Sequence, residues 1–209
     1  MDGWPQTAYS YAVAHPNNVS KLVIMDFIFA GFLPPEFGQK GPSWFAFHQV
    51  PNLPETLVQG KEREYLSWFY KGLAYNPDAI TQADIDEFVN YYSAPGGMRA
   101  AFEYYRAVFE DAEQNKEYAK EKLEILILTI GGEAAIGNYT TTSFQKVANN
   151  VTGITLPNTG HFIPEERPNF LTKPVLVFQI TSFYLILVIL LISFTLFLTD
   201  VHSRFVNII

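Results

Sequence analysis

His161 is the best-placed acid/base candidate in this sequence. A run of β-branched and aliphatic residues starts at Val151 and ends at Pro157, and the turn residues Asn158 and Gly160 then lead to the histidine. Histidine changes its charge near neutral pH, so a ring held at the end of a strand can act as a general base. The alternative is a turn histidine that only hydrogen-bonds neighbouring backbone. An acidic partner in the right place favours the catalytic interpretation.

Asp26 is the candidate partner. Small and apolar residues from Gln6 to His15 predict a short helix, and the apolar run that begins at Lys21 predicts a fully buried strand of a parallel sheet. Asp26 would then lie at the carboxyl end of that strand, where open α/β sheets place ligands and catalytic groups. The alternative for Asp26 is a helix cap or a turn residue.

A long helical insertion is expected to interrupt the sheet. Residues 31–121 show helical patterns and no strand signal, whereas Glu124–Ile130 and the run that ends at Leu156 predict strands, with a helix near Thr140–Ala148 between them. The predicted architecture is therefore α/β. An insertion of this length is expected to form a lid over the sheet.

The insertion is rich in aromatic residues. Thr81 and Asp84 form a capping pair that predicts the start of one of its helices. Aromatic stripes at helical spacing usually belong to a core, although some of them can line a substrate chamber. The candidates for such a chamber are Trp44, Phe45, Phe47, His48, Tyr104 and Tyr105.

Composition excludes several classes of function. Of the 209 residues, 48% are hydrophobic, which is typical of a folded domain, and the net charge of -7 argues against a nucleic-acid partner. The absence of cysteine excludes disulfides, cysteine nucleophiles and thiolate metal sites. The four histidines lack zinc-site spacing and the carboxylates form no calcium loop, so neither a metal nor a cofactor is expected.

The C-terminal part has a different character. No charged residue lies between Lys173 and Asp200, and the apolar segment from Val175 to Leu198 is longer than the roughly 20 residues that cross a bilayer core. We therefore predict a transmembrane helix and a single-pass membrane protein. The alternative is a buried amphipathic helix. No signal-peptide pattern follows Met1, and without a genuine tail a cytoplasmic protein is expected.

The order strand, insertion, strand, Gly-His turn is that of the α/β-hydrolases. The segment Asp2-Gly-Trp-Pro-Gln-Thr-Ala-Tyr9 resembles the nucleophile elbow Asp-x-Gly-Gly-x-x-Ala-Tyr of the epoxide hydrolase and haloacetate dehalogenase branch. The resemblance extends from about Asp2 to Asn169. Three further segments fit the pattern: Ala14-His15-Pro16, Leu22-Val-Ile-Met-Asp26 and Leu156-Pro-Asn-Thr-Gly-His161-Phe.

This resemblance implies a partial α/β-hydrolase fold that contains the C-terminal part of the parallel sheet. Residues 1–30 and 122–172 would form the core, and residues 31–121 the helical cap. Residues 173–209 would form a hydrophobic tail with the transmembrane helix at about 175–198. The strands that precede the nucleophile in the family are expected to be missing from a truncated chain.

The resemblance also implies residue roles. Asp2 would be the nucleophile, Asp26 the acid and His161 the base. Glu133 is the second choice for the acid, because the family's usual aspartate would fall near Ala135. A carboxylate can open an epoxide or displace a halide at carbon, and the histidine then activates the water that hydrolyses the ester.

The implied substrate is a small hydrophobic epoxide or a halogenated compound. Tyr105 resembles the tyrosine that hydrogen-bonds the opening epoxide oxygen, and Trp44 lies near the position of a second such tyrosine. A haloacid dehalogenase-like hydrolase of the same fold is one alternative. Another is a catalytically inactive, membrane-anchored fragment, because Trp4 and Pro5 replace the elbow glycines. A ligand-binding module that uses the aromatic cap is a third.

Overall fold

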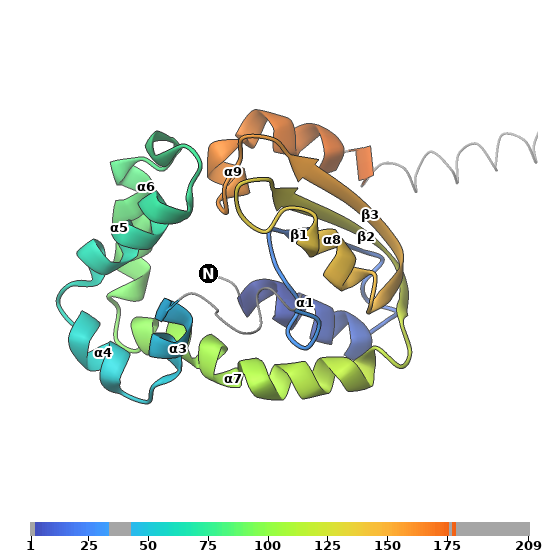
Figure 1. Ribbon diagram of the computed structural model, residues 1–209, viewed down its shortest axis with the longest axis horizontal. Helices are drawn as coiled ribbons and strands as arrows, with labels where there is room; N and C mark the ends of the chain where they lie inside the picture. Colours follow the sequence, from blue (N-terminus) through green and yellow to red (C-terminus); the bar gives the residue numbers. More distant parts are fainter. Residues whose placement is uncertain (1–2, 34–42, 176, 179–209) are drawn as a thin grey trace, which may run out of the picture. The chain divides into compact units, whose positions relative to one another are not determined.

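The computed structural model describes residues 3–33, 43–175 and 177–178. The chain divides into two compact units, Met1–Pro168 and Asn169–Ile209. In the first unit, a parallel sheet is packed with helices, and a group of helices is inserted between its first and second strands (Figure 1). This part of the chain therefore has the α/β architecture with a helical insertion that the sequence predicts.

The sheet has three parallel strands in the order β1-β2-β3, with β2 in the centre. Strand β2 continues through Gly131 and Gly132, two residues beyond the predicted strand, because it still pairs with β3 there. A side chain at Gly132 would place its Cβ 2.1 Å from the carbonyl oxygen of Gly160. Glycine at this strand end thus permits a close approach of the backbone before His161. The strands are β1 (Lys21–Met25), β2 (Leu123–Gly132) and β3 (Ala148–Leu156).

Two helices pack against the sheet through one hydrophobic cluster. They are α1 (Gly3–Ala14) and α8 (Tyr139–Phe144). Helix α8 is shorter than predicted, because Ala148 pairs with Leu123 and the chain enters β3 after a turn at residues 145–147. The buried members of the cluster are Tyr9, Ala12, Ile24, Phe29, Leu123, Ile127, Phe144, Val147 and Ala148.

The inserted helices form a cap with a hydrophobic core of its own. The predicted capping pair is confirmed, because the Thr81 hydroxyl accepts the Asp84 N–H and the Asp84 carboxylate accepts the Thr81 N–H. The buried members of the cap core are Val58, Leu66, Tyr70, Ile80, Ile85, Met98 and Phe102. The cap elements are α3 (Ser43–Gln49), α4 (Leu53–Val58), α5 (Glu62–Leu73), the 3-10 helix η1 (Pro77–Ala79), α6 (Gln82–Tyr92) and α7 (Gly97–Tyr118).

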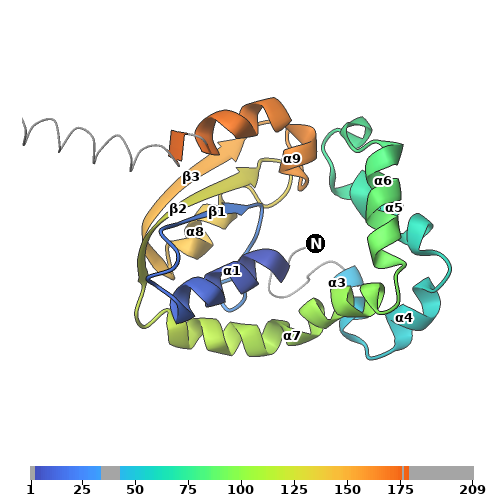
Figure 2. The same ribbon diagram turned by 180° about the vertical axis from the view of Figure 1, so that it is seen from behind.

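Helix α7 joins the cap to the sheet domain. It contacts α3, α4 and α6 as well as α1, and it runs past α1 in both opposite views (Figures 1 and 2). Asn115 on α7 is fully buried and exchanges two side-chain hydrogen bonds with Gln6 on α1, at 2.8 and 2.9 Å. It also donates to the carbonyl of Ala30 at 3.0 Å. This amide pair fixes the helix that follows Asp2 against the long helix of the cap.

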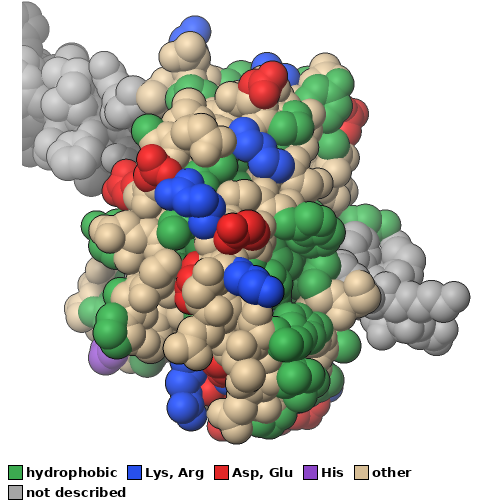
Figure 3. Space-filling view, turned by 90° about the vertical axis from the view of Figure 1, so that its left-hand side faces the viewer, with side chains coloured by type: hydrophobic (Ala, Val, Ile, Leu, Met, Phe, Trp, Pro, Cys, Tyr) green, Lys and Arg blue, Asp and Glu red, His purple; other side chains and the backbone are tan. Residues whose placement is uncertain are grey.

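The surface of the cap carries charges of both signs. Figure 3 shows the side on which the cap lies in Figure 1, where basic side chains lie next to acidic ones and hydrophobic side chains gather along one side. Arg63 of α5 pairs with Asp86 of α6 at 2.6 Å, and both side chains are exposed to solvent. Because such exposed pairs add at most about 1 kcal/mol, the apolar core is the main source of cap stability.

The last described residues lie at the start of the predicted membrane segment. Residues 168–175 and 177–178 are helical, and a short helix, α9 (Ile163–Glu166), precedes them. Of the predicted span at about 175–198, residues 176 and 179–198 lie outside the described residues, so the span itself stays a prediction. Across residues 3–33, 43–175 and 177–178, no helix is long and apolar enough to cross a membrane.

The buried amide pair leads to a prediction about stability. Asn115→Ala leaves the amide of Gln6 and the carbonyl of Ala30 without this partner in a buried site. We therefore expect the free energy of unfolding to fall by about 2 kcal/mol or more. Asn149→Ala is the matched control, because the Asn149 amide bonds Glu124 on the surface. Urea unfolding of both variants measures the difference. Equal midpoints would show that the buried pair does not hold α1 against α7.

Candidate functional site

Asp26 and His161 form a hydrogen-bonded pair at the carboxyl end of the sheet. Asp26 Oδ2 lies 2.7 Å from His161 Nδ1. The Asp26 side chain is completely buried, whereas the His161 side chain is 20% exposed. Asp26 Oδ1 accepts the N–H groups of Gly132 at 2.8 Å and of Ile136 at 3.2 Å. A carboxylate held in this way accepts a hydrogen bond from Nδ1–H, which keeps the ring proton on Nδ1 and leaves Nε2 as the basic nitrogen of the imidazole.

The end of β1 positions the carboxylate. Asp26 adopts a left-handed conformation, with φ of 42°, which aspartate tolerates better than most residues. Its N–H still donates to the carbonyl of Ile130 at 2.8 Å, so the residue stays attached to β2 while its side chain turns toward the strand ends. The pairing of β1 with β2 therefore sets the position of the acid.

The loop after β3 positions the histidine. Asn158 has φ of 50°, and the His161 N–H donates to the carbonyl of Leu73 in the cap at 3.0 Å. The Phe162 ring packs edge-on against the imidazole, with 5.1 Å between the ring centroids. The histidine is therefore held between the sheet and the end of helix α5.

Glu133, the second choice for the acid, is not in this pair. It is exposed, and its carboxylate accepts the N–H of Asn158 at 3.2 Å. Glu133 lies just past the end of β2, where the chain turns to the surface, whereas Asp26 follows β1 into the interior. Its role in the structure is to hold the turn that leads to His161.

An apolar cavity of about 50 Å³ lies beside His161. By this measure a water molecule needs roughly 10–15 Å³, so the cavity can hold a few waters or the reacting end of a small substrate. Both sequence-predicted substrate residues, Trp44 and Tyr105, line it together with the histidine. The lining residues are Trp44, His48, Tyr65, Leu66, Phe69, Tyr70, Leu73, Met98, Ala101, Phe102, Tyr105, His161 and Phe162.

His48 and Tyr65 give the cap side of this cavity polar groups that the sequence does not assign individually. His48 is 4% exposed, its Nε2 hydrogen-bonds the Tyr65 hydroxyl, and its ring packs edge-on against Tyr105, with 4.5 Å between the centroids. Tyr65 and Phe69 are four residues apart on α5, and this spacing places both on one face of the helix. It was the sequence signal that could have assigned Tyr65 to the cavity wall. The adjacent tyrosine, Tyr104, is 42% exposed and does not line the cavity.

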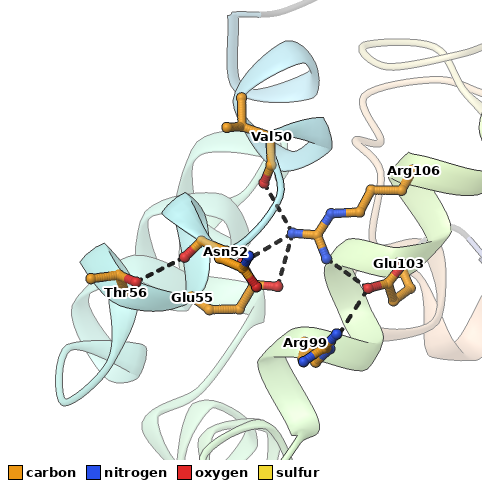
Figure 4. A network of polar contacts seen from close by, with 7 residues as sticks. All are labelled: Val50, Asn52, Glu55, Thr56, Arg99, Glu103 and Arg106. Carbon is orange, nitrogen blue, oxygen red and sulfur yellow. Dashed lines mark hydrogen bonds and ion pairs between the residues drawn. The ribbon is translucent and has the colours of Figure 1, made fainter.

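Arg106 fixes the cap around the cavity. Its side chain is 15% exposed and contacts the Glu55 carboxylate at 2.8 Å, the Glu103 carboxylate at 2.8 Å and the Val50 carbonyl at 3.1 Å (Figure 4). These contacts join α7 to α4 and to the turn that follows α3. Because α3 and α7 supply cavity-lining side chains, this network holds two walls of the cavity together.

Asp2, the sequence-predicted nucleophile, lies outside the described residues. The described chain begins at Gly3, where α1 starts. Among the described residues, no group of three or more histidine, aspartate or glutamate side chains could hold a metal ion.

Comparison with known proteins finds hydrolases. No protein-family model matches the chain. The soluble epoxide hydrolase of Corynebacterium sp. (strain C12) is 33% identical over 130 residues, which cover 61% of this chain and 45% of that protein. The chain spans less than half the length of the curated relatives that it matches.

Two solved structures extend the comparison over most of the chain. Cfl2 wild-type from Burkholderia cenocepacia is 37% identical with a TM-score of 0.75, over 85% of this chain and 63% of that chain. The epoxide hydrolase CorEH without ligand is 29% identical with a TM-score of 0.75, over 84% of this chain and 64% of that chain.

The environment of Tyr65 predicts a pH dependence of stability. Burial raises the pKa of Tyr65 from 10.0 to about 12. The folded state thus favours the neutral phenol. The contribution of this group to the free energy of unfolding is fully present below pH 10, where the phenol is neutral in both states, and it is lost as the pH rises through about 12. We expect Tyr65→Phe to lose stability less steeply across this interval than the unmodified protein. Urea midpoints measured at several pH values test this. Tyr91→Phe, at a 67% exposed tyrosine, is the control, and equal slopes for Tyr65→Phe and the unmodified protein would contradict the prediction.

Proposed function

Because the chain belongs to the epoxide hydrolase-like family of α/β-hydrolases, we propose that it is an epoxide hydrolase that works through an aspartate nucleophile. The observation that supports this most directly is the Asp26–His161 pair, at 2.7 Å, beside an apolar cavity. Asp2 is the proposed nucleophile, because it directly precedes α1 in a segment that resembles the nucleophile elbow. Asp26 is the proposed acid and His161 the proposed base.

The proposed reaction has two steps. In the first, the Asp2 carboxylate attacks an epoxide carbon, the carbon–oxygen bond of the ring breaks, and the leaving oxygen takes a proton from a donor in the cap. In the second, His161 Nε2 removes a proton from water, which attacks the carbonyl of the ester. The bond between the ester carbonyl carbon and the substrate oxygen breaks, and that oxygen takes the proton from His161 as the diol leaves. The regenerated Asp2 carboxyl group loses its proton, which returns to the cap donor. Asp26 orients the ring and stabilises the imidazolium that forms.

The cap supplies the proton donor in this proposal. Tyr105 lines the cavity, and its hydroxyl can hydrogen-bond the opening epoxide oxygen. His48 packs against Tyr105 at a centroid distance of 4.5 Å. Tyr105 is therefore the proposed proton donor.

The cavity supports a small hydrophobic substrate, because aromatic and aliphatic side chains form most of its wall. A haloacid is the alternative substrate. It is supported by Trp44, whose indole N–H can donate a hydrogen bond to a halide but does not transfer its proton to a leaving oxygen. The two substrates differ in one respect that can be tested. An opening epoxide needs a proton on its oxygen, whereas a departing halide does not.

Trapping of the ester tests the nucleophile and the base. In His161→Gln the first step remains and the second is blocked, so incubation with styrene oxide should add the mass of one substrate to the peptide that contains Asp2. Intact and peptide mass spectrometry measure the adduct, and the double variant Asp2→Asn/His161→Gln should show none. If His161→Gln carries no adduct after incubation with either styrene oxide or chloroacetate, the result would favour the catalytically inactive alternative.

Removal of the tyrosine hydroxyl distinguishes the two substrates. General acid catalysis contributes about a hundredfold or more, so we expect Tyr105→Phe to lower kcat/KM for styrene oxide by about that factor. The same variant should change the rate with chloroacetate by less than about tenfold, because halide departure needs no proton. Tyr104→Phe, at the exposed neighbouring tyrosine, should leave both rates unchanged. Equal losses for both substrates would argue against proton donation by Tyr105.

A further inference from the structure

The carboxylate of Glu166, in the last turn of α9, accepts hydrogen bonds from three backbone N–H groups. Its Oε2 accepts from Tyr75 at 2.9 Å and from Asn76 at 3.1 Å. The N–H of Gly160 lies 3.0 Å from Oε1 and 3.1 Å from Oε2. A charged acceptor forms stronger hydrogen bonds with backbone N–H groups than a neutral one. The Glu166 carboxylate therefore holds these three backbone groups firmly in place.

The three N–H groups come from two different parts of the molecule. Tyr75 and Asn76 follow α5 and belong to the cap, whereas Gly160 directly precedes His161. A further backbone bond lies beside the carboxylate, from the His161 N–H to the carbonyl of Leu73, at 3.0 Å. Residues 73–76 of the cap and residues 160–161 of the sheet domain therefore share one carboxylate and one direct backbone bond.

The contact between these segments has no room for a side chain. A Cβ atom at Gly160 would lie 2.4 Å from the Tyr75 nitrogen and 2.5 Å from the Leu73 oxygen. Gly160 does not have a positive φ, so glycine is needed here for close approach and not for an unusual backbone conformation. A shift of the cap segment toward Gly160 must therefore move the backbone next to His161.

Arg167, the next residue, binds the same loop from another side. Its guanidinium donates to the Asn158 carbonyl at 2.7 Å and to the Thr159 hydroxyl at 3.1 Å. The bonds of Arg167 go to the histidine loop, whereas those of Glu166 go to both the loop and the cap. Substitution of Arg167 therefore tests the effect of loosening the histidine loop alone. Substitution of Glu166 tests the effect of separating that loop from the cap.

We propose that Glu166 is a positioning residue that couples the cap segment 73–76 to His161, so that the cavity wall and the base are placed together. The effect on catalysis rests on the proposed function, but the coupling itself does not. Leu73 and His161 both line the cavity, one on each side of this junction. Misplacement of a catalytic group by about 1 Å can cost a hundredfold in rate, so a link of this kind matters for turnover.

The test uses the full 209-residue chain and the variant Glu166→Gln. Glutamine keeps the size of the side chain, but one of its two polar atoms becomes a donor that faces backbone N–H groups. Glu62→Gln is the matched control, since Glu62 also accepts a backbone N–H, from Gly60 at 3.0 Å, far along the chain from His161. Arg167→Gln loosens the loop without removing the bonds to Tyr75 and Asn76.

Hydrogen–deuterium exchange, read by mass spectrometry, measures the coupling without any substrate. In Glu166→Gln we expect uptake to rise about tenfold in rate in the peptides that cover residues 73–77 and 157–162 together, and not in β2. In Arg167→Gln only the second peptide should change, and in Glu62→Gln neither. Should Glu166→Gln fail to fold, the same exchange measurements on Glu166→Asp test the coupling. Uptake is again expected to rise in both peptides.

Kinetics with styrene oxide then tests the effect on the base. We expect Glu166→Gln to lower kcat by about ten- to a hundredfold with KM changed by less than about threefold, because the base is misplaced while the apolar wall remains. Unchanged exchange in either peptide would overturn the coupling. Unchanged kcat with raised exchange would overturn the positioning role. If the unmodified chain shows no turnover, the proposed function fails while the exchange result still decides the coupling.

Discussion

The buried carboxylate of Asp26 is the interaction on which the rest of the site depends. A charge without contact to solvent costs several kcal/mol unless nearby groups compensate it. Here the compensating groups are the N–H groups of Gly132 and Ile136 and the ring of His161, which come from the end of β2, the turn after it and the loop after β3. Because each contact needs a different segment in place, the carboxylate is satisfied only when the strand ends and the histidine loop are assembled together. The chemistry proposed for His161 then follows from the orientation that this carboxylate imposes.

The cap has its own apolar core within the same compact unit as the sheet, and polar contacts set how the two parts meet. Arg106 joins α7 to α4 and to the turn after α3, so that two walls of the cavity are held together. The buried amide pair of Gln6 and Asn115 joins α7 to the helix that follows the elbow segment. Apolar packing between the two parts has no preferred direction, whereas hydrogen bonds have strict geometry. The directional bonds therefore fix the position of the cavity relative to the base.

Much of the architecture could be predicted from short-range patterns. The buried run before Asp26 and the run before Pro157 are strands, and carboxyl ends of parallel strands meet at one edge of a sheet. For this reason the contact between Asp26 and His161 could be expected from their places in the chain. The boundaries of α8 could not, because the choice between helix and strand at Ala148 depends on its pairing with Leu123, a distant residue. The same limit applies to Gly131 and Gly132, which lie beyond the predicted strand and extend β2 in the fold.

The sequence by itself determined the α/β order, the place of the cap between two strands and the identity of the acid and base candidates, because these depend on periodicity and on residues at strand ends. Only the tertiary structure decided which polar groups surround the cavity. His48 and Tyr65 are seventeen residues apart and meet because α3 and α5 pack together. Glu166 binds Tyr75, ninety-one residues away, because α9 and the end of α5 meet beside Gly160. Contacts of this kind leave no periodic trace in the chain, since each depends on the packing of whole elements.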